Sequence, residues 1–152
     1  MIRSLLIGAV AGARALTPLA AVANAARRGE LPRDNGAPAW LGHPLVANAA
    51  LALAAGEMAG DKMRTAPDRI VAAGMAARIL SGGIAGAALS PRRRRVGAAA
   101  LGATAAVVAS YLTFDARMRA LRRYGQTPSG AVEDAIVLGS AAAVVRSAAP
   151  RR

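Results

Sequence analysis

The stretch from Leu51 to Gly86 carries ionisable side chains inside an otherwise apolar, helix-forming sequence. Its charges form a cluster that begins at Glu57 and ends at Arg69, followed by a single Arg78 among Ala, Ile, Leu and Gly residues. A charge buried among apolar groups is costly unless it is paired or serves a function. Any fold of this chain must therefore give these side chains partners in its interior.

The composition favours helices that pack closely in lipid. Hydrophobic residues make up 55% of the 152 residues but aromatic residues only 3%, and Ala and Gly supply much of the bulk. A water-soluble core of this size usually needs larger side chains because they bury more area. Small residues instead let helices approach closely in a membrane. An Ala-rich soluble helical protein is the alternative.

Five apolar segments are long enough, or nearly so, to cross the roughly 30 Å hydrocarbon layer of a membrane. We predict an all-α, polytopic membrane helix bundle of four or five transmembrane helices in a single domain, residues 1–152. The approximate spans are residues 4–26, 44–61, 68–89, 96–114 and 131–149. A signal peptide ending at Ala23-Asn24-Ala25 is an alternative for the first segment, but Arg14 shortens its apolar region and favours a retained helix.

The net charge of +12 comes mostly from short Arg clusters between the apolar segments. Such clusters are typical of membrane flanks that face anionic headgroups, so we expect membrane lipids as partners. The clusters are not interleaved with aromatic residues, and nucleic-acid binding is not expected. With five spans, similar numbers of basic residues fall on each side, which leaves the orientation open.

The first and third segments resemble each other. The string RALTP from Arg14 to Pro18 aligns with RILSG from Arg78 to Gly82. Each string has an Arg, a hydroxyl residue three positions later and then a helix breaker. Paired, interrupted apolar segments are a sequence sign of a transporter-like repeat. We predict an internal repeat with helices one and three interrupted, at Pro18 and at Ser81-Gly82-Gly83.

Three G-x-x-x-G motifs lie on the charge-bearing segments. Such motifs let helices approach closely and often mark helix–helix or dimer faces. We therefore expect a tightly packed centre, and the small enclosed volume of five short helices favours a homodimer. The motifs are formed by Gly8 and Gly12, Gly56 and Gly60, and Gly82 and Gly86.

The ionisable residues of these segments make up the candidate site. We predict that Arg14 and Arg78 face the carboxylates across a polar site near the bundle centre, because guanidinium groups match anionic oxygens. The carboxylates would carry a proton or cation. The candidate ligand- or ion-binding residues are Arg14, Thr17, Glu57, Asp61, Lys62, Arg78, Ser81, Glu133 and Asp134.

This site predicts a small transporter or channel-like protein for an ion or a small charged solute. The alternative is a structural or lipid-interacting membrane protein whose buried ion pairs fix the register of the helices. An enzyme is not expected, because His43 is the only histidine and no phosphate-binding glycine loop is present. We expect no cofactor and no metal ion.

Four motifs carry a resemblance to a known family: GARALTPLA from Gly12, GEMAGDKM from Gly56, AARILSGGIAGA from Ala76 and SGAVEDAI from Ser129. With these motifs the chain resembles the DUF4126 family of small bacterial integral membrane proteins of unknown function, over nearly its whole length. The chain departs from the family where Pro often follows the Asp-Lys pair, since its own Pro comes later, at Pro67. The resemblance implies a multi-pass protein of the bacterial inner membrane and no particular reaction.

Overall fold

The computed structural model describes residues 1–60 and 72–150. Within these ranges the chain has six α-helices, two short 3-10 helices and no strand, which confirms the all-helical prediction. Predicted features that fall on residues 61–71, among them Asp61, Lys62 and the start of the third segment, lie outside the described residues. The elements are α1 Ile2–Ala13, α2 Thr17–Arg27, η1 Ala39–Gly42, α3 Pro44–Gly60, α4 Ala72–Ala88, η2 Arg92–Arg94, α5 Arg95–Tyr124 and α6 Gln126–Ala148.

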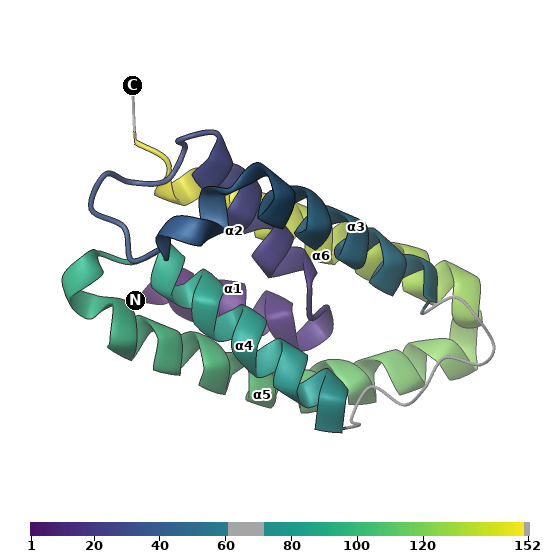
Figure 1. Ribbon diagram of the computed structural model, residues 1–152. Coiled ribbons are helices and arrows are strands. Elements are labelled where there is room, and N and C mark those ends of the chain that lie inside the picture. Colours follow the sequence, from purple (N-terminus) through teal and green to yellow (C-terminus); the bar gives the residue numbers. More distant parts are fainter. Residues whose placement is uncertain (61–71, 151–152) are drawn as a thin grey trace.

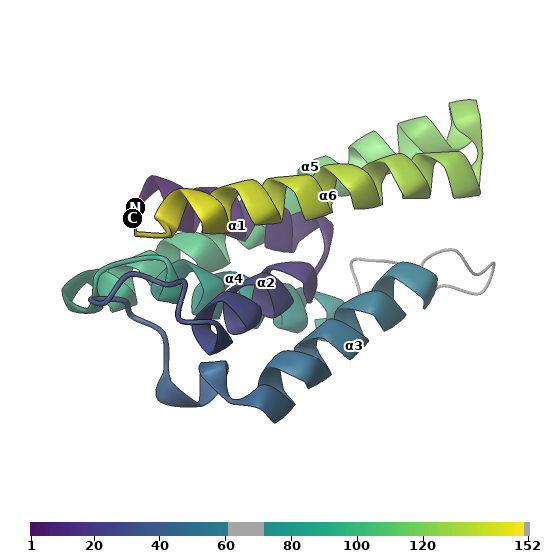
Figure 2. The same ribbon diagram turned by 90° about the horizontal axis from the view of Figure 1, so that it is seen from above.

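The first apolar segment is a helical hairpin rather than one long helix. α1 ends at Ala13, and Arg14 adopts an extended backbone conformation with φ −138° and ψ 116°. α2 begins at Thr17, with Pro18 in its first turn, where a missing N–H costs nothing. Figures 1 and 2 both show α2 running back toward the end of the molecule where α1 begins. An interruption is therefore present, although it lies at residues 14–16 rather than at Pro18, and residues 4–26 form two helices rather than one.

The interruption predicted in the third segment is absent. α4 runs without a break from Ala72 to Ala88, through Ser81, Gly82 and Gly83. A Cβ on Gly82 would lie 2.8 Å from the carbonyl oxygen of Gly102 in α5, so the absence of a side chain at Gly82 allows α4 and α5 to pack closely. The similarity between the first and third segments thus does not extend to their backbones.

The contact between α1, α4 and α5 depends on glycine. A Cβ on Gly8 would lie 2.2 Å from the Gly102 carbonyl oxygen, and a Cβ on Gly86 would lie 2.6 Å from that of Ala98. The first and third G-x-x-x-G motifs therefore pack as predicted. The second does not, because a Cβ on Gly56 or Gly60 would meet no atom of the described chain within 4 Å.

α5 and α6 are longer than predicted and are joined by one residue. α5 has 30 residues and α6 has 23, and only Gly125, with φ 83°, separates them. Residues 126–130 therefore belong to α6, which begins at Gln126 without a side-chain cap. Ser129 donates to the carbonyl oxygen of Gly125, the residue that precedes α6. A left-handed φ of this kind is readily adopted by glycine, which explains the sharp turn.

Two helices in the described ranges are long and apolar enough to cross a membrane, Arg92–Tyr124 and Gln126–Ala148. The apolar helices α1, α3 and α4 are shorter, at 12, 17 and 17 described residues. In Figures 1 and 2, helices α3 to α6 run alternately between the two ends of the molecule, and both chain termini lie at one end. We refer to this end as the terminal end.

The glycine contact gives a test of the packing. Gly102→Ala should destabilise the fold by about 1–3 kcal/mol, because a Cβ placed 2.3 Å from the Gly82 carbonyl oxygen forces α4 and α5 apart. The measurement is thermal unfolding of the purified protein, followed by circular dichroism.

The matched control is Gly139→Ala on α6, where a Cβ would meet no described atom within 4 Å. That change should be neutral or stabilise the helix by up to about 1 kcal/mol. Equal unfolding temperatures for the two variants would contradict the packing described for α4 and α5.

Candidate functional site

The tip of the α1–α2 hairpin holds a buried ion pair. Arg14 directly follows α1, and its side chain is completely buried. Its Nη2 atom donates to Oδ1 of Asp134, a buried residue of α6, at 2.5 Å. The pair joins two residues that are 120 positions apart in the sequence. It therefore fixes the position of the hairpin tip against the last helix of the chain.

A second carboxylate, that of Glu57, binds the backbone of the same tip. Glu57 lies in the last described turn of α3 and accepts hydrogen bonds from the N–H groups of Ala15 and Leu16, at 2.8 and 2.9 Å. These N–H groups precede α2 and have no acceptor within that helix. The positive end of the α2 dipole also favours a carboxylate at this point. Glu57 thus stabilises the chain reversal that Arg14 begins.

Two hydroxyl groups are buried near these elements. Thr17 begins α2 and is 3% exposed, and Ser81 in α4 is 1% exposed. Neither Oγ1 of Thr17 nor Oγ of Ser81 has a hydrogen-bond partner in the described structure. A buried hydroxyl without a partner is costly, so such groups are candidates for contact with a bound molecule or water.

A third carboxylate, in the first half of α6, forms a separate ion pair. Glu133 accepts from Nη1 of Arg117, in α5, at 2.7 Å, and the two side chains are 17% and 13% exposed. Sequence analysis missed Arg117 because it lies among the basic residues that follow the fourth apolar segment and was assigned to the membrane flank. Since α5 continues as one helix past this segment, Arg117 faces α6 instead.

The predicted site residues are thus only partly brought together. Arg14 and Asp134 form an ion pair. Glu57 binds two backbone N–H groups of the same hairpin tip rather than an arginine side chain. Arg78 is buried in α4, 4% exposed, and Glu133 belongs to the pair with Arg117. Within residues 1–60 and 72–150, no three carboxylate or histidine side chains lie close enough to hold a metal ion.

The chain matches no protein-family model, no curated protein and no solved structure.

The buried pair gives a second test. Asp134→Ala should lower the free energy of unfolding by about 3–5 kcal/mol, because it leaves the Arg14 guanidinium buried without this carboxylate. The double variant Arg14→Met with Asp134→Leu should recover much of the loss, since it removes both charges together. Chemical denaturation of each purified variant measures the effect.

The control is Asp115→Ala, which breaks the exposed pair between Asp115 and Arg119 within α5. Both side chains are more than 60% exposed, so the change should cost less than about 1 kcal/mol. Similar losses for Asp115→Ala and Asp134→Ala would argue against a buried, energetically important pair.

Proposed function

We propose that the chain is a multi-pass protein of the bacterial inner membrane that conducts or transports a small anion through the hairpin tip. Two long apolar helices support a membrane location. The distribution of side chains supports it too, because Arg14, Arg78 and Asp134 are buried while many large apolar side chains are exposed. Residues more than half exposed include Leu45, Leu53, Leu80, Val96, Leu112 and Ile136.

The proposed topology has four spans and one hairpin that enters the membrane without crossing it. α3 to α6 alternate between the two ends of the molecule, and the described parts of α3 and α4 reach the lower limit of about 17 residues for a span. α1 and α2, at about 18 and 16 Å, are each too short to cross. The hairpin would therefore place its tip inside the hydrocarbon layer.

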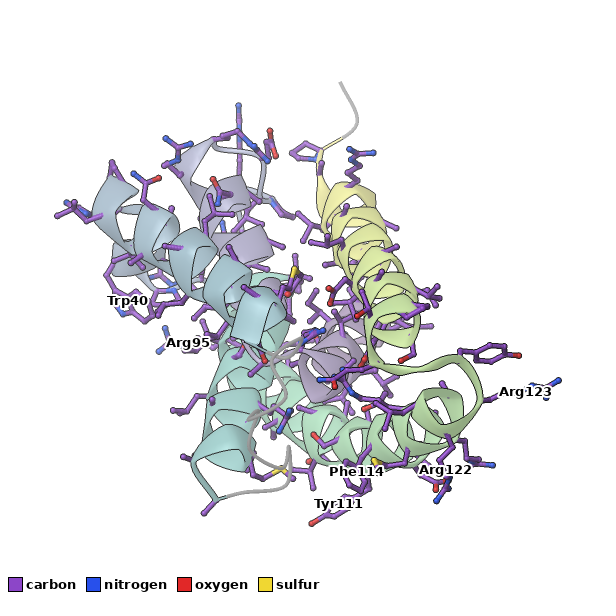
Figure 3. The ribbon with its side chains drawn as sticks, turned by 90° about the vertical axis from the view of Figure 1, so that its right-hand side faces the viewer. Trp40, Arg95, Tyr111, Phe114, Arg122 and Arg123 are labelled. Atoms are coloured by element: carbon purple, nitrogen blue, oxygen red, sulfur yellow. The ribbon has the colours of Figure 1, made fainter. Side chains whose placement is uncertain are left out.

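Basic residues support one orientation for this topology. Among the residues that the structure describes, the terminal end is the more basic one, and the positive-inside rule places such an end in the cytoplasm. Figure 3 shows Arg122 and Arg123, which belong to the opposite end, pointing away from the bundle. The described basic residues at the terminal end are Arg3, Arg27, Arg28, Arg33, Arg92, Arg93, Arg94, Arg95 and Arg146, and those at the opposite end are Arg117, Arg119, Arg122 and Arg123.

The lack of native cysteine makes the orientation testable. Single variants Ser147→Cys and Tyr124→Cys place one thiol at each end, both at exposed positions. A membrane-impermeant maleimide added to intact cells should label the cysteine at position 124 and spare the one at position 147. The opposite labelling would reverse the orientation, and labelling of both would contradict the topology.

The contact that carries the functional proposal is the one between Glu57 and the N–H groups of Ala15 and Leu16. Paired N–H groups at the start of a helix form an anion site, because they donate in one direction and lie at the positive end of the helix dipole. The Glu57 carboxylate occupies this site as a built-in anion. A solute anion would bind when the carboxylate leaves, with the buried Arg14 guanidinium beside it.

This mechanism predicts opposite effects for two charge removals. Glu57→Gln should raise anion flux several-fold, because a neutral amide competes less well with a solute anion for the two N–H groups. Arg14→Ala should abolish flux, because it removes the positive charge at the tip. The measurement is chloride and nitrate flux in liposomes that contain the purified protein.

The control is Asp115→Asn, an exposed carboxylate of α5 that should leave flux unchanged. Wild-type flux that is no higher than that of empty liposomes, together with an inactive Glu57→Gln variant, would contradict the transport proposal.

A structural or lipid-interacting protein is the second candidate. The observation that favours it is that the Asp134 Oδ1 atom and both Glu57 oxygens already have protein partners at the tip. On this proposal the charges hold the hairpin in place, and no solute moves. The motif resemblance to DUF4126 agrees with either candidate, and membership of that family is part of the proposal.

A homodimer is also part of the proposal. A Cβ on Gly56 or Gly60 of α3 would meet no described atom within 4 Å. These glycines therefore form an open small-residue face on a helix that also has exposed leucines. In a membrane such a face favours close contact with a second helix.

A further inference from the structure

A groove runs between α2, α3 and α6, on the side of the hairpin away from α5. Its volume is about 810 Å³, within the range of sites that hold molecules larger than a simple ion. In Figure 2 α2 lies between α3 and α6, and it forms the floor of the groove. α3 packs mainly on α2 and η1, so that the wall it forms stands apart from α6.

The floor of the groove is one face of α2. Its lining residues Thr17, Asn24 and Arg28 recur at helical spacing, together with Ala20 and Ala21 between them. From Thr17 to Arg28 this face extends for about 16 Å. The walls are mostly apolar, with Leu51, Ala54 and Met58 from α3 and Leu138, Ala142 and Val145 from α6.

The end of the groove at the terminal end of the molecule carries positive charge. Arg28, directly after α2, and Arg146, in the last turn of α6, both line it. Glu30 pairs with Arg28 at 2.8 Å, and both of these side chains are about half exposed. Arg146 is exposed and has no ion pair within the described chain. One net positive charge therefore remains at this opening.

We propose that the groove binds an anionic phospholipid. The phosphate lies between Arg146 and Arg28, and one acyl chain follows the apolar walls inward to Thr17. Guanidinium groups match phosphate oxygens, and an apolar groove about 16 Å long needs an apolar occupant. This inference rests on the membrane location in the proposed function, and does not depend on anion transport.

Other occupants fit the charge and shape less well. A small inorganic anion would leave the apolar walls uncovered. A zwitterionic lipid would add no net charge to balance the arginines. A helix from a second copy would meet the two arginines with few acidic residues, because the chain has 8 Asp and Glu against 20 Lys and Arg.

The first test compares ligands of matched chemistry on the full chain purified in detergent. Native mass spectrometry measures binding of phosphatidylglycerol and of phosphatidylcholine with the same acyl chains, and thermal unfolding measures the response to inorganic phosphate. Phosphatidylglycerol should bind about tenfold more tightly than phosphatidylcholine, because the choline ammonium offsets the phosphate charge beside Arg146; tenfold corresponds to about 1.4 kcal/mol. Inorganic phosphate alone should not raise the unfolding temperature.

The second test uses two pairs of variants. Arg146→Gln should reduce phosphatidylglycerol affinity to the level of phosphatidylcholine, while Arg123→Gln, at the opposite end of the molecule, should not. Ala142→Trp should fill the groove and abolish binding of both lipids. Ala143→Trp, one position along α6 and exposed outside the groove lining, should leave binding intact.

The proposal is overturned by equal binding of the two lipids to the wild type, by stabilisation with inorganic phosphate alone, or by unchanged lipid binding in Ala142→Trp. A change of oligomeric state in Ala142→Trp without loss of lipid binding would assign the groove to a second copy instead. Glu57→Gln, which tests the anion site, should leave phosphatidylglycerol binding unchanged. The two proposals can therefore fail separately.

Discussion

The fold depends on how the backbone N–H and C=O groups find hydrogen-bond partners where α1 ends and α2 begins. A helix that breaks inside an apolar bundle leaves N–H and C=O groups without partners, and each such group is costly away from water. Here the Glu57 carboxylate accepts from two of these N–H groups, and Asp134 balances the arginine beside them. The two carboxylates come from α3 and α6, so the hairpin is held by helices on either side of it.

Close packing holds the other face of the hairpin. α1 lies against α4 and α5, and at Gly8, Gly82 and Gly102 the helices approach so closely that any added Cβ would meet a backbone carbonyl oxygen. The hairpin thus has a packed, glycine-lined face toward α5 and a more open face toward the groove beside α2. This asymmetry leaves room for a bound molecule in the groove beside α2.

Apolar periodicity and composition were sufficient to predict an all-helical chain, the approximate places of its apolar segments and a break near Pro18. They could not predict that the chain reverses there, because a break in an apolar run is equally compatible with a kinked helix. The role of Gly82 was also ambiguous in the sequence, because a glycine can either interrupt a helix or allow a second helix to approach closely. The short distance between Gly82 and Gly102 shows that it allows close approach. Arg14 and Asp134 were both candidates, but their pairing depends on the tertiary arrangement, as does that of Arg117 with Glu133.

The sequence separation of Arg14 and Asp134 has a consequence for synthesis of the protein. Arg14 leaves the ribosome before Asp134, which is made 120 residues later. Contacts so distant in sequence form late, after the intervening loop has been closed. The Arg14 guanidinium therefore cannot meet this carboxylate until the 120 residues that follow it have been translated. A chain that stops before α6 would lose more than one helix, because its opening hairpin would keep a charge whose buried partner was never made.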